Sequence, residues 1–244
     1  ATIHAKEDGT LAGTLLAMEF FKTVDPVLKV TIERPDGTAV RPGDVLMTAE
    51  GSARSILQAE RVVLNCLQRM SGIATKTKRM TEKLDGLRTR LLDTRKTTPG
   101  FRTQEKEAVK AGGGMNHRTG LYDMILIKNN HIDLGGGVSK VVKAAIQYRK
   151  ESGKDLKIEV EARTMEEVKE ILDAGPVDRI MLDNFSPAEI KEAVKLIEGR
   201  CETEASGNIR EENIRSYAES GVDFISCGAL THSYNSLDIS LKAT

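Results

Sequence analysis

The sequence predicts a mixed α/β protein in which a strand-rich N-terminal unit precedes a longer region of alternating strands and helices. Three observations support this fold class. Short segments separated by turn residues fill residues 1–51, helical spacing follows over residues 52–84, and short apolar runs alternate with amphipathic segments from Leu91 onward. Such β-α alternation is typical of parallel strands joined by crossover helices.

The N-terminal unit is predicted to contain short strands joined by tight turns. Leu28–Ile32 alternates apolar and polar residues, and a Pro and an Asp-Gly pair follow it. A second turn leads into the short strand Val45–Thr48. Helical spacing then begins after Ser52, a candidate N-cap residue, and we expect Gly72 to divide this region into two helices.

From Leu91 onward, predicted strands alternate with predicted helices. The strands are Leu91–Asp93, Met124–Ile127, Ile158–Val160, Ile180–Leu182, Glu202–Ala205 and Phe224–Ser226. The helices are Gln104–Ala111, Val138–Lys150, Met165–Ala174, Pro187–Glu198 and Arg210–Ser220. Ser186 and Glu189 have the spacing of a capping box, and Pro187 stands at the first helical position.

Polar or small residues follow all six of these predicted strands. In chain order they are Arg95 with Lys96, Lys128, Glu161, Asp183, Ser206 with Gly207, and Cys227 with Gly228. In a barrel the C-terminal ends of all strands surround one mouth, whereas the outer strands of an open sheet lie far from a single crevice. The pattern therefore favours a barrel over a doubly wound sheet. At any single position, an ordinary polar strand end is an equally good interpretation.

The overall charge excludes a generally basic protein. Lys plus Arg and Asp plus Glu number 36 each, so the formal net charge is zero, and this removes the usual indication of a nucleic-acid or anionic-membrane partner. No stretch approaches the roughly 20 apolar residues of a membrane helix. The three cysteines are scattered without a CxxC pair, which suits a reducing compartment, and the four histidines form no zinc-binding pattern.

The charges are nevertheless segregated along the chain. A basic group follows the first two predicted strands, comprising Arg95, Lys96, His117, Arg118 and Lys128. Arginine binds carboxylates or phosphates with two parallel hydrogen bonds, and lysine adds a point charge, so these residues could hold a polyanion. Exposed loop cations are the commoner alternative.

Two acidic residues, Glu161 and Asp183, each end an apolar strand. Carboxylates facing cations suggest a phosphorylated substrate that carries Mg²⁺, or a developing positive charge. Ser206, Gly207 and Gly228 would offer small side chains and N–H groups to a terminal phosphate. The residues thus predict phosphate-ester chemistry on a second anionic partner without naming the reaction.

Nine segments, in order over nearly the whole chain, carry a family resemblance. They are AKEDGTLAG (5–13), AERVVLNCLQRMSGIAT (59–75), DTRKTTPGFR (93–102), GGGMNHRTGLYD (112–123), LIKNNH (126–131), EVE (159–161), MLDN (181–184), EASGNI (204–209) and CGALTHS (227–233). The chain resembles the quinolinate phosphoribosyltransferases, also called nicotinate-nucleotide pyrophosphorylases (carboxylating). DTRKTTPGFR, GGGMNHRTGL and LIKNNH together are highly specific.

The resemblance implies an N-terminal α/β sandwich domain plus a C-terminal seven-stranded α/β barrel, although only six barrel strands are found here. The implied domains are residues 1–67, without their leading segment and joined by residues 235–244, and the catalytic barrel, residues 68–234. The implied reaction transfers the phosphoribosyl group of phosphoribosyl diphosphate to quinolinate with decarboxylation, giving nicotinate mononucleotide, CO₂ and diphosphate in NAD biosynthesis. Mg²⁺, a cytoplasmic location and a homodimer or higher oligomer with shared active sites are also expected.

Carried over by motif, the resemblance implies a role for each candidate residue. The catalytic residues would be Lys96, Lys128, Glu161 and Asp183, of which the two carboxylates would attend the ribose and Mg²⁺, directly or indirectly. The substrate-binding residues would be Arg61, Arg95, His117, Arg118, Ser206, Gly207 and Gly228, and Arg61 would reach the neighbouring subunit's site. The family often has Gly at the position of Asn208.

Two other functions are left open. One is a related phosphoribosyltransferase of the same fold that acts on a different base, for which so many pocket cations would be unnecessary. The other is a non-catalytic metabolite-binding homologue, which would not require Lys128, Glu161 and Asp183 together. A nucleic-acid binder is least supported, because the chain has no Trp and only 4% aromatic residues.

Overall fold

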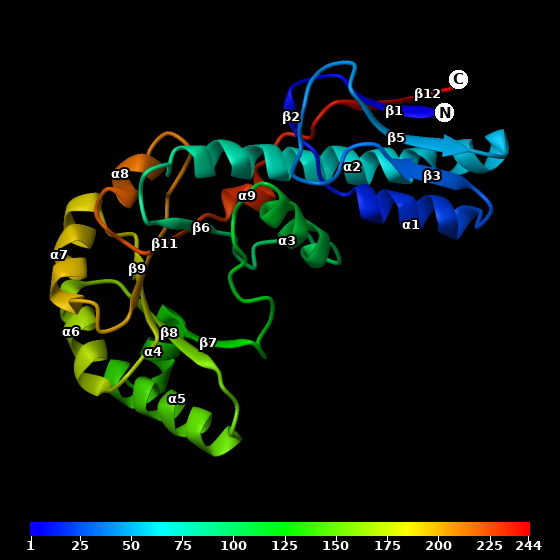
Figure 1. Ribbon diagram of the computed structural model, residues 1–244. Coiled ribbons are helices and arrows are strands. Elements are labelled where there is room, and N and C mark those ends of the chain that lie inside the picture. Colours follow the sequence, from blue (N-terminus) through cyan, green and yellow to red (C-terminus); the bar gives the residue numbers. More distant parts are fainter. The chain divides into compact units, whose positions relative to one another are not determined.

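The computed structural model describes residues 1–244, which divide into two compact units (Figure 1). Unit 1 consists of Ala1–Thr81, Lys96–Asn116 and Gly228–Thr244. Unit 2 consists of Glu82–Arg95 and His117–Cys227. Every helix in the structure is too short or too polar to cross a bilayer.

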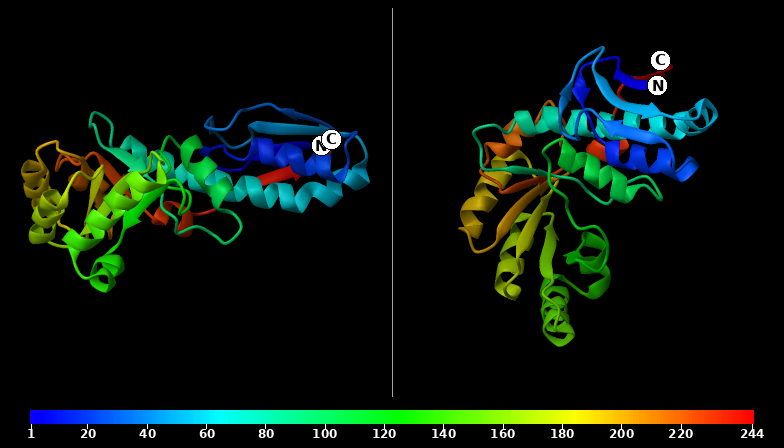
Figure 2. Two further views of the ribbon diagram at one scale, coloured as in Figure 1. Left: turned by 90° about the horizontal axis from the view of Figure 1, so that it is seen from below. Right: turned by 45° about the vertical axis from the view of Figure 1, so that its right-hand side comes forward.

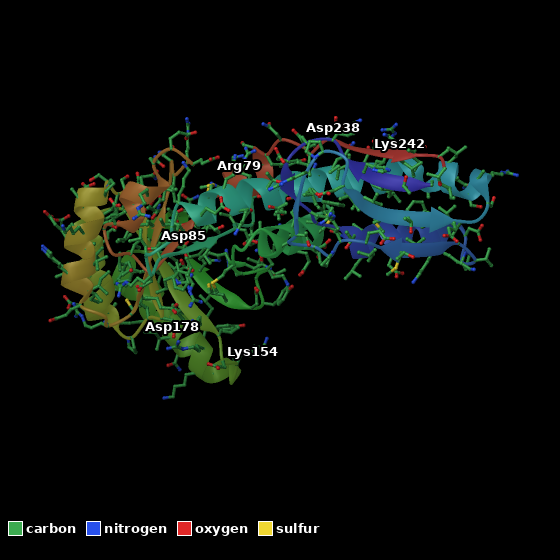
Figure 3. All side chains as sticks on the ribbon, turned by 45° about the horizontal axis from the view of Figure 1, so that its top comes forward. Arg79, Asp85, Lys154, Asp178, Asp238 and Lys242 are labelled. Atoms are coloured by element: carbon green, nitrogen blue, oxygen red, sulfur yellow. The ribbon has the colours of Figure 1, made fainter.

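Unit 1 is built on a four-stranded antiparallel sheet with the order β12-β1-β5-β3. Its strands are β1 (Thr2–Ala5), β5 (Val45–Glu50), β3 (Lys29–Ile32) and β12 (Ile239–Lys242), and a separate pair is formed by β2 (Gly9–Thr10) and β4 (Ala39–Val40). The last strand of the chain therefore pairs with the first. Figure 3 labels Asp238 and Lys242 on this C-terminal segment.

Helices complete the first unit. They are α1 (Thr14–Val24), α2 (Ala53–Glu82), α3 (Arg102–Ala111) and the short α9 (Ala229–His232). Phe21 of α1, Leu46 of β5 and Leu67 of α2 are fully or almost fully buried in one hydrophobic cluster. Because residues of the helices and of the sheet share this cluster, unit 1 has a two-layer α/β core.

The expectation that Gly72 divides the helical region is wrong, because α2 is continuous over 30 residues. A Cβ atom at Gly72 would lie 2.1 Å from the carbonyl oxygen of Asn235. The glycine therefore permits a close approach of two backbones inside unit 1, and it breaks no helix.

Unit 2 contains a six-stranded parallel sheet with the order β6-β11-β10-β9-β8-β7. The strands are β6 (Arg90–Leu92), β7 (Met124–Ile127), β8 (Lys157–Ala162), β9 (Arg179–Asp183), β10 (Glu202–Ser206) and β11 (Phe224–Ser226). All six correspond to the strands predicted from the sequence. The mixed α/β fold with a parallel sheet is confirmed, and the count of seven strands is not.

The helices of unit 2 connect successive strands. They are α4 (Asn129–Gly135), α5 (Val138–Ser152), α6 (Met165–Ala174), α7 (Pro187–Ile197) and α8 (Ile214–Ala218). Helices α5, α6 and α7 lie along one side of the sheet, as both views in Figure 2 show. At the start of α7 the predicted capping box is present, since Glu189 accepts a hydrogen bond from the backbone N–H of Ser186 at 2.7 Å. The opposite side of the sheet and its carboxyl edge carry the polar residues described next.

Candidate active site

The carboxyl edge of the parallel sheet gathers several of the predicted residues. Lys128 follows the last residue of β7, Glu161 lies near the end of β8, and Asp183 ends β9. Ser206 ends β10 and is directly opposite Asp183 in the strand register. These ends meet because neighbouring parallel strands finish at the same edge.

Lys128, Glu161 and Asp183 are joined through Asn129, a residue that the sequence analysis did not single out. The Nζ of Lys128 lies 3.3 Å from Oε1 of Glu161, and the backbone N–H of Asn129 donates to Oε2 at 3.0 Å. The side-chain amide of Asn129 donates to Oδ2 of Asp183 at 3.3 Å. The structure thus places one lysine and two carboxylates around the first residue of α4.

A second group of charged residues lies deeper on the same strands. Residues two apart in a strand face the same side, so Glu159 lies below Glu161 and Glu204 below Ser206. The Nε2 of His117 is 3.0 Å from Glu159 Oε2 and 3.4 Å from Glu204 Oε2. Both glutamates are fully buried. We call His117, Glu159 and Glu204 the buried triad.

Arg179 supports the buried triad from the N-terminal end of β9. Its Nη1 donates to Glu204 Oε2 at 2.8 Å, and its Nη2 donates to Glu202 at 3.0 Å. Glu159, Glu204 and Arg179 were missed by the sequence analysis. The signal that could have revealed them is charge at alternate positions of predicted strands, because in E-V-E and E-T-E-A-S the charged residues share one face.

The buried triad shifts the pKa values of His117 and of its two glutamates. Burial by itself would lower the pKa of His117, but the hydrogen bonds and charges of Glu159 and Glu204 outweigh it and raise that pKa to about 9. Burial and the charge of Glu204 raise the pKa of Glu159 to about 7. Glu204 is equally buried, but His117 and Arg179 bring its pKa below the ordinary value. Two carboxylates that share one imidazole therefore have their pKa values pushed apart.

His117 also orders the backbone around Arg118. Its backbone N–H donates to Asp93 Oδ1 at 2.8 Å, and its Nδ1 accepts the backbone N–H of Arg118 at 2.7 Å. Burial, and next the charge of Arg95, lower the pKa of the Arg118 guanidinium. A bound anion would offset the repulsion between the guanidinium groups of Arg95 and Arg118. This agrees with the predicted anion-binding role of these residues.

In the turn after β10, the backbone lies close to the side chain of Asn184. Gly207 has φ +95, and a Cβ there would lie 2.2 Å from Asn184 Oδ1. Asn208 has φ +53 and donates its side-chain N–H to the same oxygen at 3.2 Å. Asn is one of the few non-glycine residues that adopt this left-handed conformation readily. Asn208 can therefore adopt here a backbone conformation that otherwise favours Gly.

The other three predicted site residues belong to unit 1. Arg61 is exposed on α2, and Lys96 is exposed in the loop before α3. The carbonyl of Lys96 accepts a hydrogen bond from the hydroxyl of Thr231 at 2.9 Å. Gly228 precedes α9, and a Cβ there would lie 3.0 Å from the Lys96 side chain. The functional roles of these three residues stay predictions.

Two groups of residues could offer ligand atoms to a divalent cation. His117, Glu159 and Glu204 present ligand atoms within 4.8 Å of one another, but Nδ1 of His117 accepts the backbone N–H of Arg118, so Nε2 carries the ring proton and has no lone pair for a metal. Glu161 and Asp183 lie at the carboxyl edge, and Asp183 is partly exposed. Mg²⁺ prefers to keep several waters and to bind one or two carboxylates together with substrate phosphates. Glu161 and Asp183 therefore fit this ion better than the buried triad.

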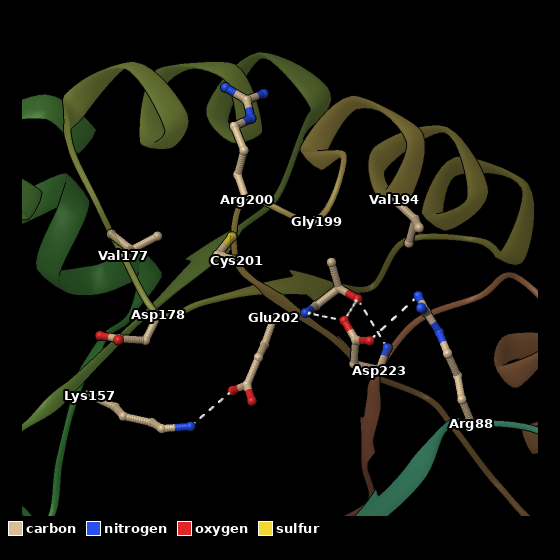
Figure 4. Close-up of a pocket in the computed structure, with 11 residues that line it drawn as sticks. Arg88, Lys157, Val177, Asp178, Val194, Gly199, Arg200, Cys201, Glu202 and Asp223 are labelled. Carbon is tan, nitrogen blue, oxygen red and sulfur yellow. Dashed lines mark hydrogen bonds and ion pairs between the residues drawn. The ribbon is translucent and has the colours of Figure 1, made fainter.

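A cavity of about 530 Å³ lies at the opposite, N-terminal edge of the sheet (Figure 4). Its charged lining residues are largely paired with one another: Lys157 lies 3.3 Å from Glu202, and Arg88 lies 3.5 Å from Asp223. Because none of the predicted site residues lines it, this cavity is separate from the candidate site.

The fold and the carboxyl edge together define an α/β enzyme whose parallel sheet carries side chains of both charges at that edge. Comparisons with known proteins identify the family. Residues 1–71 match the family described as "Quinolinate phosphoribosyl transferase, N-terminal domain", and residues 73–242 match "Quinolinate phosphoribosyl transferase, C-terminal domain". The chain belongs to the quinolinate phosphoribosyltransferase family.

Individual relatives support the same assignment. The chain is 50% identical over 252 residues to "Nicotinate-nucleotide pyrophosphorylase [carboxylating], chloroplastic" of Arabidopsis thaliana, covering 98% of this chain and 72% of that protein. It is 44% identical to the "Probable nicotinate-nucleotide pyrophosphorylase [carboxylating]" of Bacillus subtilis, covering 100% and 83%. Among solved structures, NadC from Streptococcus pyogenes has a TM-score of 0.92 at 41% identity, covering 99% and 84%.

Proposed function

We propose that this protein transfers the phosphoribosyl group of phosphoribosyl diphosphate to quinolinate with decarboxylation, giving nicotinate mononucleotide, CO₂ and diphosphate in NAD biosynthesis. The observation that carries the proposal is the contact of Lys128 with Glu161, and of Asn129 with Glu161 and Asp183, at the carboxyl edge of the unit 2 sheet. Relatives at 44–50% identity bear the corresponding enzyme names.

The substrates account for the two kinds of charge at this edge. Quinolinate carries two carboxylates and phosphoribosyl diphosphate carries phosphates, so cationic groups such as Arg95, Arg118 and His117 suit the binding of both. The Nε2 of His117 faces Glu159 and Glu204 inside the buried triad. Its Nδ1 accepts the backbone N–H of Arg118, so His117 orders the backbone beside that residue.

The carboxylates serve the reacting carbon and the metal. As the pyridine nitrogen displaces diphosphate at the ribose C1, positive charge develops on the ribose, and Glu161 and Asp183 would stabilise it. The same two residues would hold Mg²⁺, which neutralises the leaving diphosphate when it is bound. Lys128 contacts Glu161 at 3.3 Å and so fixes the direction of that carboxylate. After transfer, the carboxylate beside the ring nitrogen leaves as CO₂, and its bonding electron pair stays on that ring carbon, where the adjacent cationic nitrogen stabilises it. The carbon then takes up a proton.

Several parts of the proposal rest on the resemblance alone. These are the Mg²⁺ requirement, catalysis by Lys96, phosphate binding by Ser206, Gly207 and Gly228, a homodimer or higher oligomer in which Arg61 reaches the neighbouring site, and a cytoplasmic location. Sedimentation of the purified protein tests the oligomer. Activity after chelation, with and without added Mg²⁺, tests the metal.

The decisive experiment combines purified protein with quinolinate, phosphoribosyl diphosphate and Mg²⁺. We expect release of CO₂ and formation of nicotinate mononucleotide, measured by chromatography, and little product when nicotinate replaces quinolinate. Turnover with another base but not with quinolinate would contradict the proposal and support a related transferase. Binding of quinolinate without turnover would support the non-catalytic alternative.

Two substitutions test the cationic site within the same assay. Lys128→Ala and Arg118→Ala should lose most activity while the circular dichroism spectrum stays unchanged. Lys154→Ala is the matched control, because Lys154 is an exposed lysine of unit 2 in a loop before β8. Wild-type kinetics in both site variants would refute the assignment of this edge.

A further inference from the structure

Arg69 lies in the middle of α2 with its guanidinium close to two aromatic rings. Its Cζ is 4.9 Å from the ring centre of Tyr234 and 5.5 Å from that of Phe101. The side chain is about one-quarter exposed, at 27%. Stacking of this kind limits the guanidinium to one plane and so fixes the direction of its N–H groups.

Those N–H groups converge on Glu105, which is completely buried in α3. The Nε of Arg69 donates to Glu105 Oε1 at 3.1 Å, and its Nη2 contacts both the same oxygen and the hydroxyl of Thr98. The second oxygen of Glu105 accepts the backbone N–H of Thr98 at 3.1 Å. Arg69 and Glu105 therefore hold both the side chain and the backbone of Thr98. We call these two residues the clamp.

The clamp holds Thr98, which lies two residues after Lys96 in the chain. The carbonyl of Lys96 is held by the hydroxyl of Thr231 at 2.9 Å. The backbone from residue 96 to residue 98 is thus fixed at both ends. Pro99 and Gly100 then form an exposed turn, with φ +76 at the glycine. Without the clamp, Thr98 would lose the side-chain contacts that hold it, while the hydrogen bond from Arg102 Nε to the Thr97 hydroxyl at 3.0 Å would remain.

We propose that Arg69 is a positioning residue that, through Glu105 and Thr98, sets the direction in which Lys96 is presented to the substrates. The proposal rests on the proposed function, in which Lys96 is catalytic. All of its contacts lie inside unit 1. This role requires a guanidinium, because the planar group contacts a carboxylate and a hydroxyl at once while lying over aromatic rings, which an ammonium does not do.

The principal test replaces Arg69 by Lys, which keeps the positive charge beside the buried carboxylate. We expect kcat to fall by about 100-fold, because misplacing a reacting group by about 1 Å has an effect of this size, while KM for both substrates changes little. Arg79→Lys is the matched control, since Arg79 is an exposed arginine of the same helix. It should retain wild-type kcat.

Three further measurements separate positioning from general stability. Thr98→Val removes only the hydroxyl that receives the guanidinium, and we expect it to lower kcat by about 10-fold without changing the thermal unfolding midpoint. In Arg69→Ala, added ethylguanidinium should restore part of the lost kcat. Trypsin cleavage after Lys96 should be faster in Arg69→Lys than in the wild type.

The outcomes also separate this inference from the proposed function. A wild-type protein that does not turn over quinolinate overturns the function itself. An active wild type, together with wild-type kcat in both Arg69→Lys and Thr98→Val, overturns the role of the clamp. A fall in kcat that parallels loss of folded protein, without rescue by ethylguanidinium, assigns Arg69 a structural role and also overturns it.

Discussion

Replacing Glu204 by Gln should move the titration of His117. The ordinary pKa of a histidine is 6.5, and in this protein Glu159 and Glu204 raise that of His117 to about 9, against the opposing effect of burial. This difference corresponds to about 3 kcal/mol of folding stability. Because the folded pKa is the higher one, the stabilisation is fully present below pH 6.5 and is lost as the pH rises through about 9.

The substitution keeps the shape of the side chain but removes one of the two negative charges that face His117. We expect the pKa of His117 to fall by at least one unit and the loss of stability between pH 6.5 and 9 to shrink to about half. At pH 7 the variant should be less stable than the wild type by about 3 kcal/mol, since Arg179 and His117 lose a buried partner.

Two assays check this expectation. The chain has four histidines, so the imidazole proton resonances can be followed individually by NMR, with a His117→Asn variant for assignment. Urea unfolding at several pH values gives the stability. Glu202→Gln is the control, because Glu202 pairs with the same Arg179 but its side chain is 37% exposed. An unchanged His117 titration in Glu204→Gln would refute the reasoning.

Three other substitutions or reactions test separate parts of the structure. Gly72→Ala should destabilise the protein in urea unfolding by about 3 kcal/mol, because the new Cβ would lie 2.1 Å from the Asn235 carbonyl oxygen. Gly207→Ala should lower activity more than 10-fold, as measured in the quinolinate assay, since φ +95 is strained for alanine and the methyl group meets Asn184 at 2.2 Å. Iodoacetamide should label Cys201 slowly at pH 8 and rapidly only near pH 11, because burial raises the pKa of this thiol to about 11; fast labelling at pH 8 would contradict the burial.

The parallel sheet could be predicted because its signals are local. Each strand of unit 2 is a short apolar run bounded by polar residues, and α7 begins with a capping box that the structure contains. The sheet of unit 1 was only partly predicted. Its strand β1 pairs with β12 from the other end of the chain, where Thr2 lies opposite Lys242. No short window of sequence contains that information.

Helix α4 was missed for a different reason. Its N-terminus is capped by His131, whose Nδ1 accepts the backbone N–H of Lys128 at 2.9 Å, and no Ser, Thr or Asp occupies the N-cap position. The helix is also only seven residues long. Asn129 was overlooked with it, although this residue connects Glu161 to Asp183. Strand ends therefore indicated the charged members of the site but not the amide that joins them.

The buried triad explains why charge lies inside this sheet at all. Barrel interiors are usually filled by branched apolar side chains, and a buried ion pair is commonly no more stabilising than such packing. Glu159 and Glu204 are completely buried, so stability alone does not account for them. They hold Nε2 of His117, at 3.0 and 3.4 Å, and Nδ1 of the same ring accepts the backbone N–H of Arg118. Through His117, the two glutamates thus affect the carboxyl edge, where Arg118 would meet an anionic substrate. Loss of Glu159 or Glu204 should therefore weaken substrate binding as well as folding.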